Sequence, residues 1–158
     1  MLEGQQPLKG RKKILALSSG GGHWVQLRRI MPAFEGHYIA YATVNSHYRS
    51  EVPGAVFYEV VDVTRWNKAK WIVAVAQLLW IFLKERPDIV VSTGALPGYL
   101  GIRLASALGK RTIWVDSIAN VEELSMSGQR IGAYADLWLT QWPHLAKENG
   151  PEYAGQVL

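Results

Sequence analysis

The sequence predicts an α/β domain with a doubly wound, Rossmann-like parallel sheet. Short apolar runs typical of buried strands alternate with longer segments of helical character, a pattern that favours a parallel sheet covered on both faces. Glycine-rich or polar stretches directly follow three of the expected strands. The 158 residues suit one core of sizeable volume. We therefore expect a basic arm over residues 1–12 and a single domain over residues 13–158.

The expected strands are short, apolar and bounded by turn signals. They cover residues 13–17, 38–44, 56–60, 88–92, 111–115 and 136–140. Between the second and third strands, residues 45–53 are polar, and we expect a surface excursion there. Residues 141–158, which include Pro143 and Pro151, form the tail.

Helices are expected between these strands. They lie at about residues 23–31 and 67–86, from the loop at 93–101 to residue 108, and up to about residue 134. Pro32 and Pro87 follow the first two helices, because helix is disfavoured at the residue before a proline. Asn67 can cap the start of the second helix with its side chain. Gly109 is placed to close the third as a C-cap.

The centre of the second helix, WIVAVAQLLWIFL over residues 71–83, has one polar residue, Gln77. A surface helix ordinarily shows a single apolar stripe, whereas this one is apolar nearly all round. Three explanations stay open: burial within the fold, contact with a partner, or partial insertion into a membrane interface. For the membrane, the candidate contacts are Trp71, Trp80 and Phe82, since indole rings suit the headgroup boundary.

Composition restricts the class of protein only loosely. A net charge of +4 and a pI near 9.4 are compatible with anionic lipid, nucleic acid or phosphorylated substrates. Without cysteine, the chain has no disulfide framework and no thiolate metal site. No run of about 18–20 apolar residues predicts a transmembrane helix, and no signal peptide is expected. The basic cluster Lys9, Arg11, Lys12 and Lys13 is either a solvated tail or a weak attraction to an anionic membrane.

The clearest chemical signal is the stretch ILALSSGGGHWVQL over residues 14–27. A strand followed by a glycine-rich turn and a helix leaves backbone N–H groups free at a positive helix end, which attracts phosphate. A dinucleotide fingerprint fails, because Val25 replaces the third glycine and no acidic residue ends the second strand. No P-loop is present either. We favour an anion or sugar-phosphate contact over a turn without a ligand, and the candidate ligand-binding residues are Ser19, Gly20, Gly21, Gly22 and His23.

Two further strand ends carry candidate residues. A second loop contains Thr93, Gly94, Pro97 and Gly98. It is either an ordinary connection between a strand and a helix or a second wall of an acceptor site. Asp116 follows the fifth strand and is either a base for a sugar hydroxyl or a turn residue. Ligands of such sheets bind at the carboxyl ends of strands, so the three stretches point to one cleft.

Histidine offers one further candidate for proton transfer. His23 at the start of the first helix either packs there or faces the cleft as a base. The other histidines, His37, His47 and His144, show no metal-ligand spacing, and we predict no metal site.

Three motifs in fixed order resemble one family, the acceptor-side subunit of bipartite GT-B glycosyltransferases. The motifs are SSGGGHWVQL, STGALPGYLG and WVDSIANVEELS…GAYADLWLTQWP. Eukaryotic members partner the catalytic subunit that makes the second GlcNAc addition on dolichol diphosphate, and bacterial members serve capsule and exopolysaccharide biosynthesis. The first loop is also similar to that of the N-acetylglucosaminyltransferase that forms lipid II.

The resemblance implies that this domain is the N-terminal, acceptor half of a GT-B fold. The donor half is then a separate catalytic chain that binds the UDP-sugar. The implied reaction is an inverting hexosyl transfer from a UDP-sugar to a polyprenyl-diphosphate-linked saccharide at the cytoplasmic face of the membrane. No cofactor and no nucleic-acid partner are implied. The alternative, from another class, is a non-catalytic scaffold or activator of a partner glycosyltransferase.

Residue by residue, the resemblance carries over the loop at 20–23 and the set Thr93, Gly94, Pro97 and Gly98. Asp116 stands where the family commonly has Glu, and so keeps the carboxylate with one methylene less; Asn120 stands where a basic residue is frequent. Because the family holds its partner through the C-terminal tail, the candidate partner contacts are Tyr153, Val157 and Leu158. Eukaryotic members carry an N-terminal anchor; we expect none here, and we expect peripheral membrane attachment through residues 71–83 and the arm.

Overall fold

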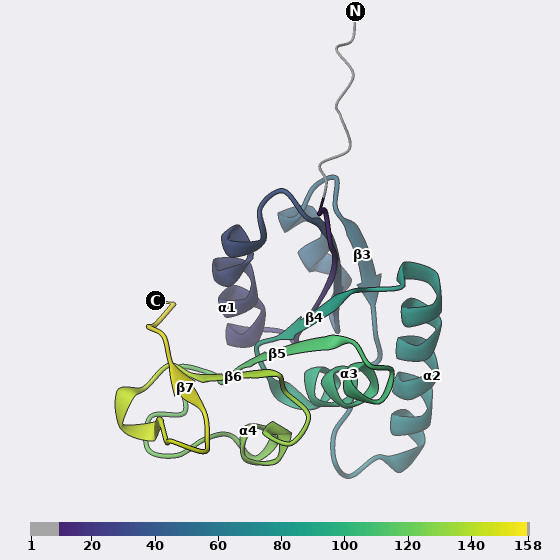
Figure 1. Cartoon of the computed structure of the whole chain (residues 1–158). Coiled ribbons are helices and arrows are strands. Elements are labelled where there is room, and N and C mark those ends of the chain that lie inside the picture. The colour runs from purple at the N-terminus through teal and green to yellow at the C-terminus, as the bar shows by residue number, and fades with distance from the viewer. Residues whose placement is uncertain (1–9, 158) are drawn as a thin grey trace, which may run out of the picture.

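In the computed structural model, which describes residues 10–157, a fully parallel sheet runs through the molecule (Figure 1). Its strands are β1 (Lys13–Leu17), β2 (Tyr38–Thr43), β3 (Val56–Glu59), β4 (Ile89–Ser92), β5 (Arg111–Val115), β6 (Leu137–Thr140) and β7 (Glu152–Tyr153). They lie in the order β3-β2-β1-β4-β5-β6-β7. The predicted fold class is confirmed. Most of the predicted arm, residues 1–9, and Leu158 lie outside the described residues.

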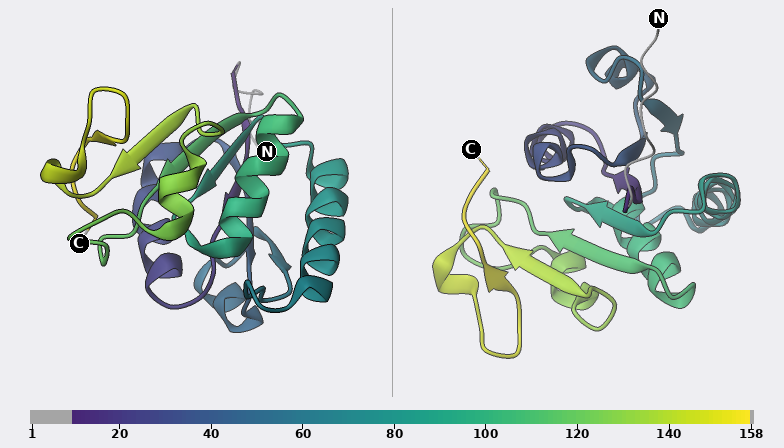
Figure 2. Two further views of the ribbon diagram at one scale, coloured as in Figure 1. Left: turned by 90° about the horizontal axis from the view of Figure 1, so that it is seen from below. Right: turned by 45° about the horizontal axis from the view of Figure 1, so that its top comes forward.

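Helices cover both faces of the sheet (Figure 2). The α-helices are α1 (Gly22–Ile30), α2 (Lys68–Glu85), α3 (Ala95–Ala107) and α4 (Met126–Ile131). The short 3-10 helices are η1 (Met31–Phe34), η2 (Ser46–Glu51) and η3 (Pro143–Leu145). Alternate residues of β1 serve the two faces. Ile14 and Ala16 pack against α1, while Leu15 and Leu17 pack in the cluster formed with α2, α3 and α4.

The centre of the sheet is the point at which strand order reverses. The chain moves outward from β1 to β2 and β3, and then returns to place β4 on the other side of β1. Leu17 at the end of β1 lies opposite Ser92 at the end of β4. The segments that leave these two strands must therefore emerge side by side, at the place where open α/β sheets bind ligands.

The residues expected to cap the longer helices lie at the start of α2 and just after the end of α3. The Asn67 side chain accepts the Lys70 backbone N–H at the start of α2. Gly109, with φ +67°, follows the end of α3. Glycine adopts this left-handed conformation without the clash that a Cβ would cause.

The second glycine-bearing loop is shorter than predicted. Helix α3 already begins at Ala95, so Pro97 and Gly98 are buried in its first turns and do not line a loop. A Cβ on Gly98 would stand 1.9 Å from Ser92 Oγ, so this glycine permits close packing of α3 on β4. Their predicted place in an open ligand-binding loop is wrong, because Pro is well accommodated in a first helical turn.

Two segments expected to be irregular have structure. Residues 46–51 form η2, started by Asn45, whose side chain accepts the His47 N–H. In the tail, β7 pairs with β6 and extends the sheet by two residues. Neither segment shows the apolar periodicity from which a strand or helix is recognised in a sequence.

Candidate functional site

The two strand-end loops are joined by a reciprocal pair of hydrogen bonds. His23 Nδ1 lies 2.9 Å from the Thr93 carbonyl oxygen, and Thr93 Oγ1 donates to the His23 carbonyl at 2.6 Å. Because a carbonyl oxygen only accepts, Nδ1 must carry the proton in the first bond. In the neutral ring, Nε2 then has the free lone pair, which is the form needed in a base.

Gly94 makes this pairing possible. Its φ is +125°, and a Cβ built on it would stand 2.8 Å from two atoms of the His23 ring. A side chain at this position would be strained and would displace the imidazole. The structure thus brings together the predicted residues His23, Thr93 and Gly94.

The first glycine turn is held by a phenol. Gly21, with φ +64°, is the N-cap of α1, and its N–H donates to Tyr48 Oη at 2.8 Å. Gly21 and Gly22 are exposed, while Ser19 and Gly20 are half-buried. By helix geometry the first N–H groups of α1 have no intrahelical acceptor. The turn therefore has donors available for an anion, and its role in binding one stays a prediction.

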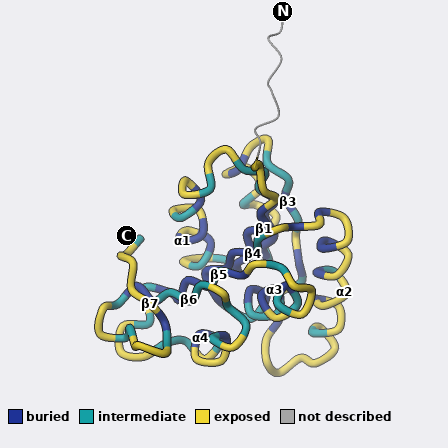
Figure 3. The backbone as a smooth tube through the Cα atoms, viewed as in Figure 1, coloured by how far each residue is buried: buried dark blue, intermediate teal, exposed yellow. Residues whose placement is uncertain are grey.

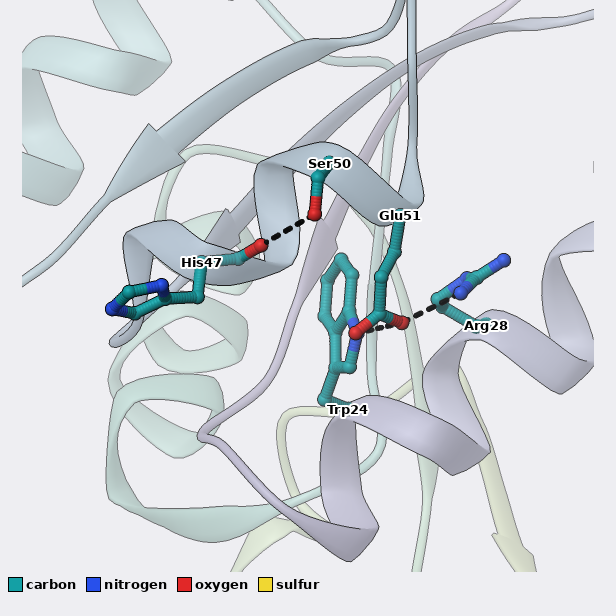
Figure 4. A network of polar contacts seen from close by, with 5 residues as sticks. All are labelled: Trp24, Arg28, His47, Ser50 and Glu51. Carbon is teal, nitrogen blue, oxygen red and sulfur yellow. Dashed lines mark hydrogen bonds and ion pairs between the residues drawn. The ribbon is translucent and has the colours of Figure 1, made fainter.

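Helix η2 lies over α1 through a polar and aromatic cluster (Figure 4). The Tyr48 ring stacks on Trp24 with centroids 4.9 Å apart. Trp24 Nε1 donates to Glu51 Oε2 at 3.1 Å, and Arg28 donates to the same oxygen at 2.6 Å. The Trp24 hydrogen bond, and after it the Arg28 guanidinium, lower the pKa of the Glu51 carboxyl. Tyr48 is thereby held in place above the glycine turn.

The hydrogen bonds of Glu51 in this cluster predict that the stability of the domain falls at acidic pH. A lowered folded-state pKa means that the stabilisation from Glu51 is present above its ordinary pKa and is lost as pH falls below it. We expect the urea midpoint of the wild type to fall between neutral pH and about pH 3.5 by more than that of Glu51→Gln. The exposed Glu35→Gln is the control and should follow the wild type. Equal pH dependence of all three proteins would contradict the prediction.

Asp116 lies at the end of β5 but is turned inward, with 1% of its surface exposed. Its Oδ1 accepts from Ser125 Oγ at 2.6 Å and from Trp114 Nε1 at 3.2 Å. Its Oδ2 accepts from the Ser125 N–H at 2.9 Å and from Asn120 Nδ2 at 3.1 Å. The carboxylate therefore organises the segment that follows β5. The role of base stays a prediction, and the four donors now favour a positioning role.

Gln26 is a residue that sequence reasoning missed. It is 5% exposed, and its Nε2 donates to the Gly22 carbonyl at 3.2 Å and to Ser117 Oγ at 3.1 Å. Its Oε1 accepts the Ile118 N–H at 2.9 Å. It thereby joins the glycine turn to the segment after β5. A glutamine one helical turn after Gly22 was the only signal, and it is a weak one.

Two hollows on the described part of the chain do not include the paired loops. These hollows, of about 470 and 530 Å³, share Gln129, Trp138 and Asn149 in their walls. They contain neither His23 nor Thr93. The candidate site is thus an open edge of the sheet, formed by backbone turns and a few side chains.

The three predicted membrane contacts differ in how far they are exposed. Phe82 is 4% exposed and packs in the core, so its prediction as a membrane contact is wrong. Trp71 is half-buried, and its Nε1 donates to the Thr64 carbonyl at 3.0 Å. Trp80 is 54% exposed, with the Lys84 ammonium 4.8 Å from its ring centroid. Among residues 10–157, no helix combines the length and apolarity that crossing a bilayer requires.

The described end of the tail is bound to its own domain. The Val157 N–H donates to Gln141 Oε1 at 2.9 Å, and the Val157 carbonyl accepts from Arg29 at 3.3 Å. Tyr153 in β7 is 43% exposed. The predicted contacts of Tyr153 and Val157 with a partner stay predictions, and Leu158 falls outside the described residues.

Comparisons with known proteins show the family of the chain. Residues 59–157 match the family described as oligosaccharide biosynthesis protein Alg14 like. The Schizosaccharomyces pombe protein named UDP-N-acetylglucosamine transferase subunit alg14 is 27% identical over 198 residues, covering 99% of this chain and 91% of the relative. The human subunit ALG14 is 34% identical over 83 residues, which are 48% of this chain and 38% of the human protein.

A solved structure supports the fold. The crystal structure of Acinetobacter baumannii MurG superposes with a TM-score of 0.74 at 13% identity, covering 90% of this chain and 45% of that one. The chain thus spans less than half of MurG. The sheet and its helices correspond to one half of that GT-B enzyme.

Proposed function

The chain belongs to the family of Alg14-like oligosaccharide biosynthesis proteins, and from this we propose that it is the acceptor-binding subunit of a two-chain glycosyltransferase. The transferase moves a sugar, GlcNAc in the named relatives, from a UDP-sugar to a lipid-diphosphate-linked saccharide in surface polysaccharide assembly. A relative that this chain covers for 91% of its length is itself named a subunit, which supports a separate donor-side chain. The observation that carries the proposal is the joined pair of loops, His23 with Thr93, at the sheet's switch point.

The proposed chemistry uses a small number of groups on this chain. The first N–H groups of α1 donate hydrogen bonds to diphosphate oxygens, and the positive helix end favours their negative charge. The acceptor hydroxyl attacks the anomeric carbon as the bond to the UDP leaving group breaks. Its proton passes to His23 Nε2, while Nδ1 stays bound to the Thr93 carbonyl. The donor nucleotide is bound by the partner.

The direct test is reconstitution with the donor-side chain. Each chain alone and the two together are incubated with labelled UDP-GlcNAc and a short-chain polyprenyl-diphosphate-linked saccharide. We expect label in the lipid fraction only when both chains are present. Equal transfer by the donor-side chain alone would overturn the proposal.

One observation favours the alternative of a scaffold or activator. The four donors around Asp116 leave this carboxylate little freedom to meet a substrate. If neither His23 nor Asp116 contributes to chemistry, variants that keep the fold retain full turnover in the reconstituted pair. That result would establish the scaffold function.

We also propose that the chain attaches to an anionic membrane surface through α2. The buried stripe of this helix includes Ala74, Leu78 and Ile81. A second apolar stripe faces outward, as the exposed colour along α2 in Figure 3 illustrates. It consists of Ile72, Val73, Val75, Leu79, Trp80 and Leu83, of which Ile72 and Leu83 are each 74% exposed. Lys68 and Lys70 precede it, and Lys84 and Arg86 follow it.

This arrangement suits a membrane interface, where apolar side chains enter the headgroup boundary and cations meet anionic lipid. Because α2 follows β3 in a parallel crossover, it starts at the carboxyl edge of the sheet, where the candidate site lies. A lipid-linked acceptor would then reach the glycine turn from the bound surface.

The double variant Ile72→Glu/Leu83→Glu is expected to lose binding to phosphatidylglycerol vesicles by about 10²- to 10⁴-fold, since burying each of the two apolar side chains contributes roughly 1.5–3 kcal/mol of binding free energy. Flotation on a density gradient measures it. Leu108→Glu, at a 49% exposed position outside the stripe, should float like the wild type. Wild-type protein that stays at the bottom of the gradient would contradict the membrane proposal.

A further inference from the structure

Four segments of the chain meet at two buried glutamine side chains. Gln26 from α1 and Gln141 after β6 are 5% and 2% exposed, and Gln141 Nε2 donates to Gln26 Oε1 at 2.6 Å. Gln141 Nε2 also donates to the Asp116 carbonyl at 3.0 Å. Its Oε1 accepts the Val157 N–H of the tail at 2.9 Å. A buried primary amide is costly unless its groups are paired, and here both amides are.

The bonds have a single direction. They run from the Val157 N–H to Gln141, from Gln141 to Gln26, and from Gln26 to the Gly22 carbonyl. We refer to this chain of bonds as the amide relay. Neither amide can rotate by half a turn, because the Gln26 NH2 would then face the Ile118 N–H and the Gln141 NH2 would face the Val157 N–H. Hydrogen bonds in such a chain polarise one another and strengthen together.

We propose that Gln26 and Gln141 are positioning residues that couple the C-terminal tail to the glycine turn and to the segment after β5. The tail supplies the donor for Gln141 Oε1, and that bond orients the Gln141 NH2 toward Gln26. Gln26 in turn fixes the Gly22 carbonyl and the Ile118 N–H on two neighbouring strand ends. When the tail leaves, the Gln141 carbonyl loses its partner, and the amide relay loosens at both strand ends.

The coupling is a property of this chain alone and holds or fails independently of the proposed transfer. If the transfer function holds, the coupling makes the geometry of the candidate site depend on the position of the tail. A binding partner that draws Val157 away from Gln141 would alter the spacing between the glycine turn and the Asp116 segment. The position of the tail would then affect the geometry of the candidate site.

The test uses ¹⁵N NMR of the full chain and of two variants. In one variant the chain ends after Gln156, which removes the tail donor and leaves both glutamines in place. The other is Gln141→Leu, which keeps the volume and removes the amide. We expect the Ile118 amide to exchange with solvent about tenfold faster in both, equivalent to about 1.4 kcal/mol. The side-chain NH2 signals of Gln26 should shift in both.

Gln156→Ala is the matched control, because Gln156 neighbours Val157 and is exposed. Its Ile118 exchange and Gln26 signals should stay at wild-type values. The buried Leu15 amide in β1 reports whether the fold is intact, and its exchange should be unchanged in every variant. If the shortened chain keeps wild-type Ile118 exchange and Gln26 signals, the tail is not coupled to the strand ends and the proposal is overturned.

Discussion

Replacing Asp116 by asparagine is expected to lower the free energy of unfolding by about 3 kcal/mol, because a buried carboxylate that accepts four hydrogen bonds loses part of its acceptor capacity. Each carboxylate oxygen of Asp116 accepts two of these hydrogen bonds. In asparagine an NH2 group replaces one of the oxygens, so two of the donors would face another donor. Either the buried Trp114 N–H or the Ser125 N–H is left without an acceptor. Urea denaturation followed by tryptophan fluorescence measures the loss.

Asp62→Asn is the control for this substitution, since Asp62 is exposed, and it should unfold like the wild type. The experiment also separates the two roles considered for Asp116. A positioning residue gives reduced stability, and the loss of turnover follows from a displaced segment. A variant with wild-type stability and no turnover would instead identify Asp116 as the base.

Replacing His23 by asparagine is expected to lower kcat of the reconstituted pair by about 10²–10⁴-fold, the usual contribution of a general base. Asparagine places its amide nitrogen close to the position of Nδ1. It therefore keeps a donor for the Thr93 carbonyl and removes Nε2. Stability should stay near that of the wild type, while His23→Ala should lose both the hydrogen bond and the activity.

The asparagine variant makes the result specific. Loss of kcat with KM for the lipid-linked acceptor nearly unchanged identifies a group that acts in the chemical step. Full turnover by His23→Asn would show that Nε2 takes no part. The Thr93 contact alone would then account for the presence of a histidine.

The sequence was most informative where local rules decide the structure. The buried strand β1, the Asn67 cap and the alternation of strands and helices all follow from neighbouring residues. The convergence of His23 and Thr93 was predictable because parallel strands place their carboxyl ends at one edge. The inward turn of Asp116 was not, because it depends on Ser125 and Trp114 and on how the segment between them folds.

Two wrong predictions have clear physical causes. For Pro97 and Gly98, glycine and proline were interpreted as loop residues, whereas close packing of α3 on β4 requires them within the helix. For Phe82, the sequence of α2 shows apolar residues on all sides and contains no information about which stripe meets the sheet. The role of Gln26 could not be predicted for a related reason, since three of its four partners, Ser117, Ile118 and Gln141, come from two distant segments.

The reciprocal bonds between His23 and Thr93 join residues that are 70 positions apart in the chain. Contacts of such long sequence separation form slowly, because the intervening chain must first be ordered. The first glycine turn therefore has no wall opposite it until β4 has been synthesised and has paired with β1. During synthesis, the candidate site is assembled late, and a nascent chain that has not yet released β4 from the ribosome carries the histidine without the threonine carbonyl that orients it.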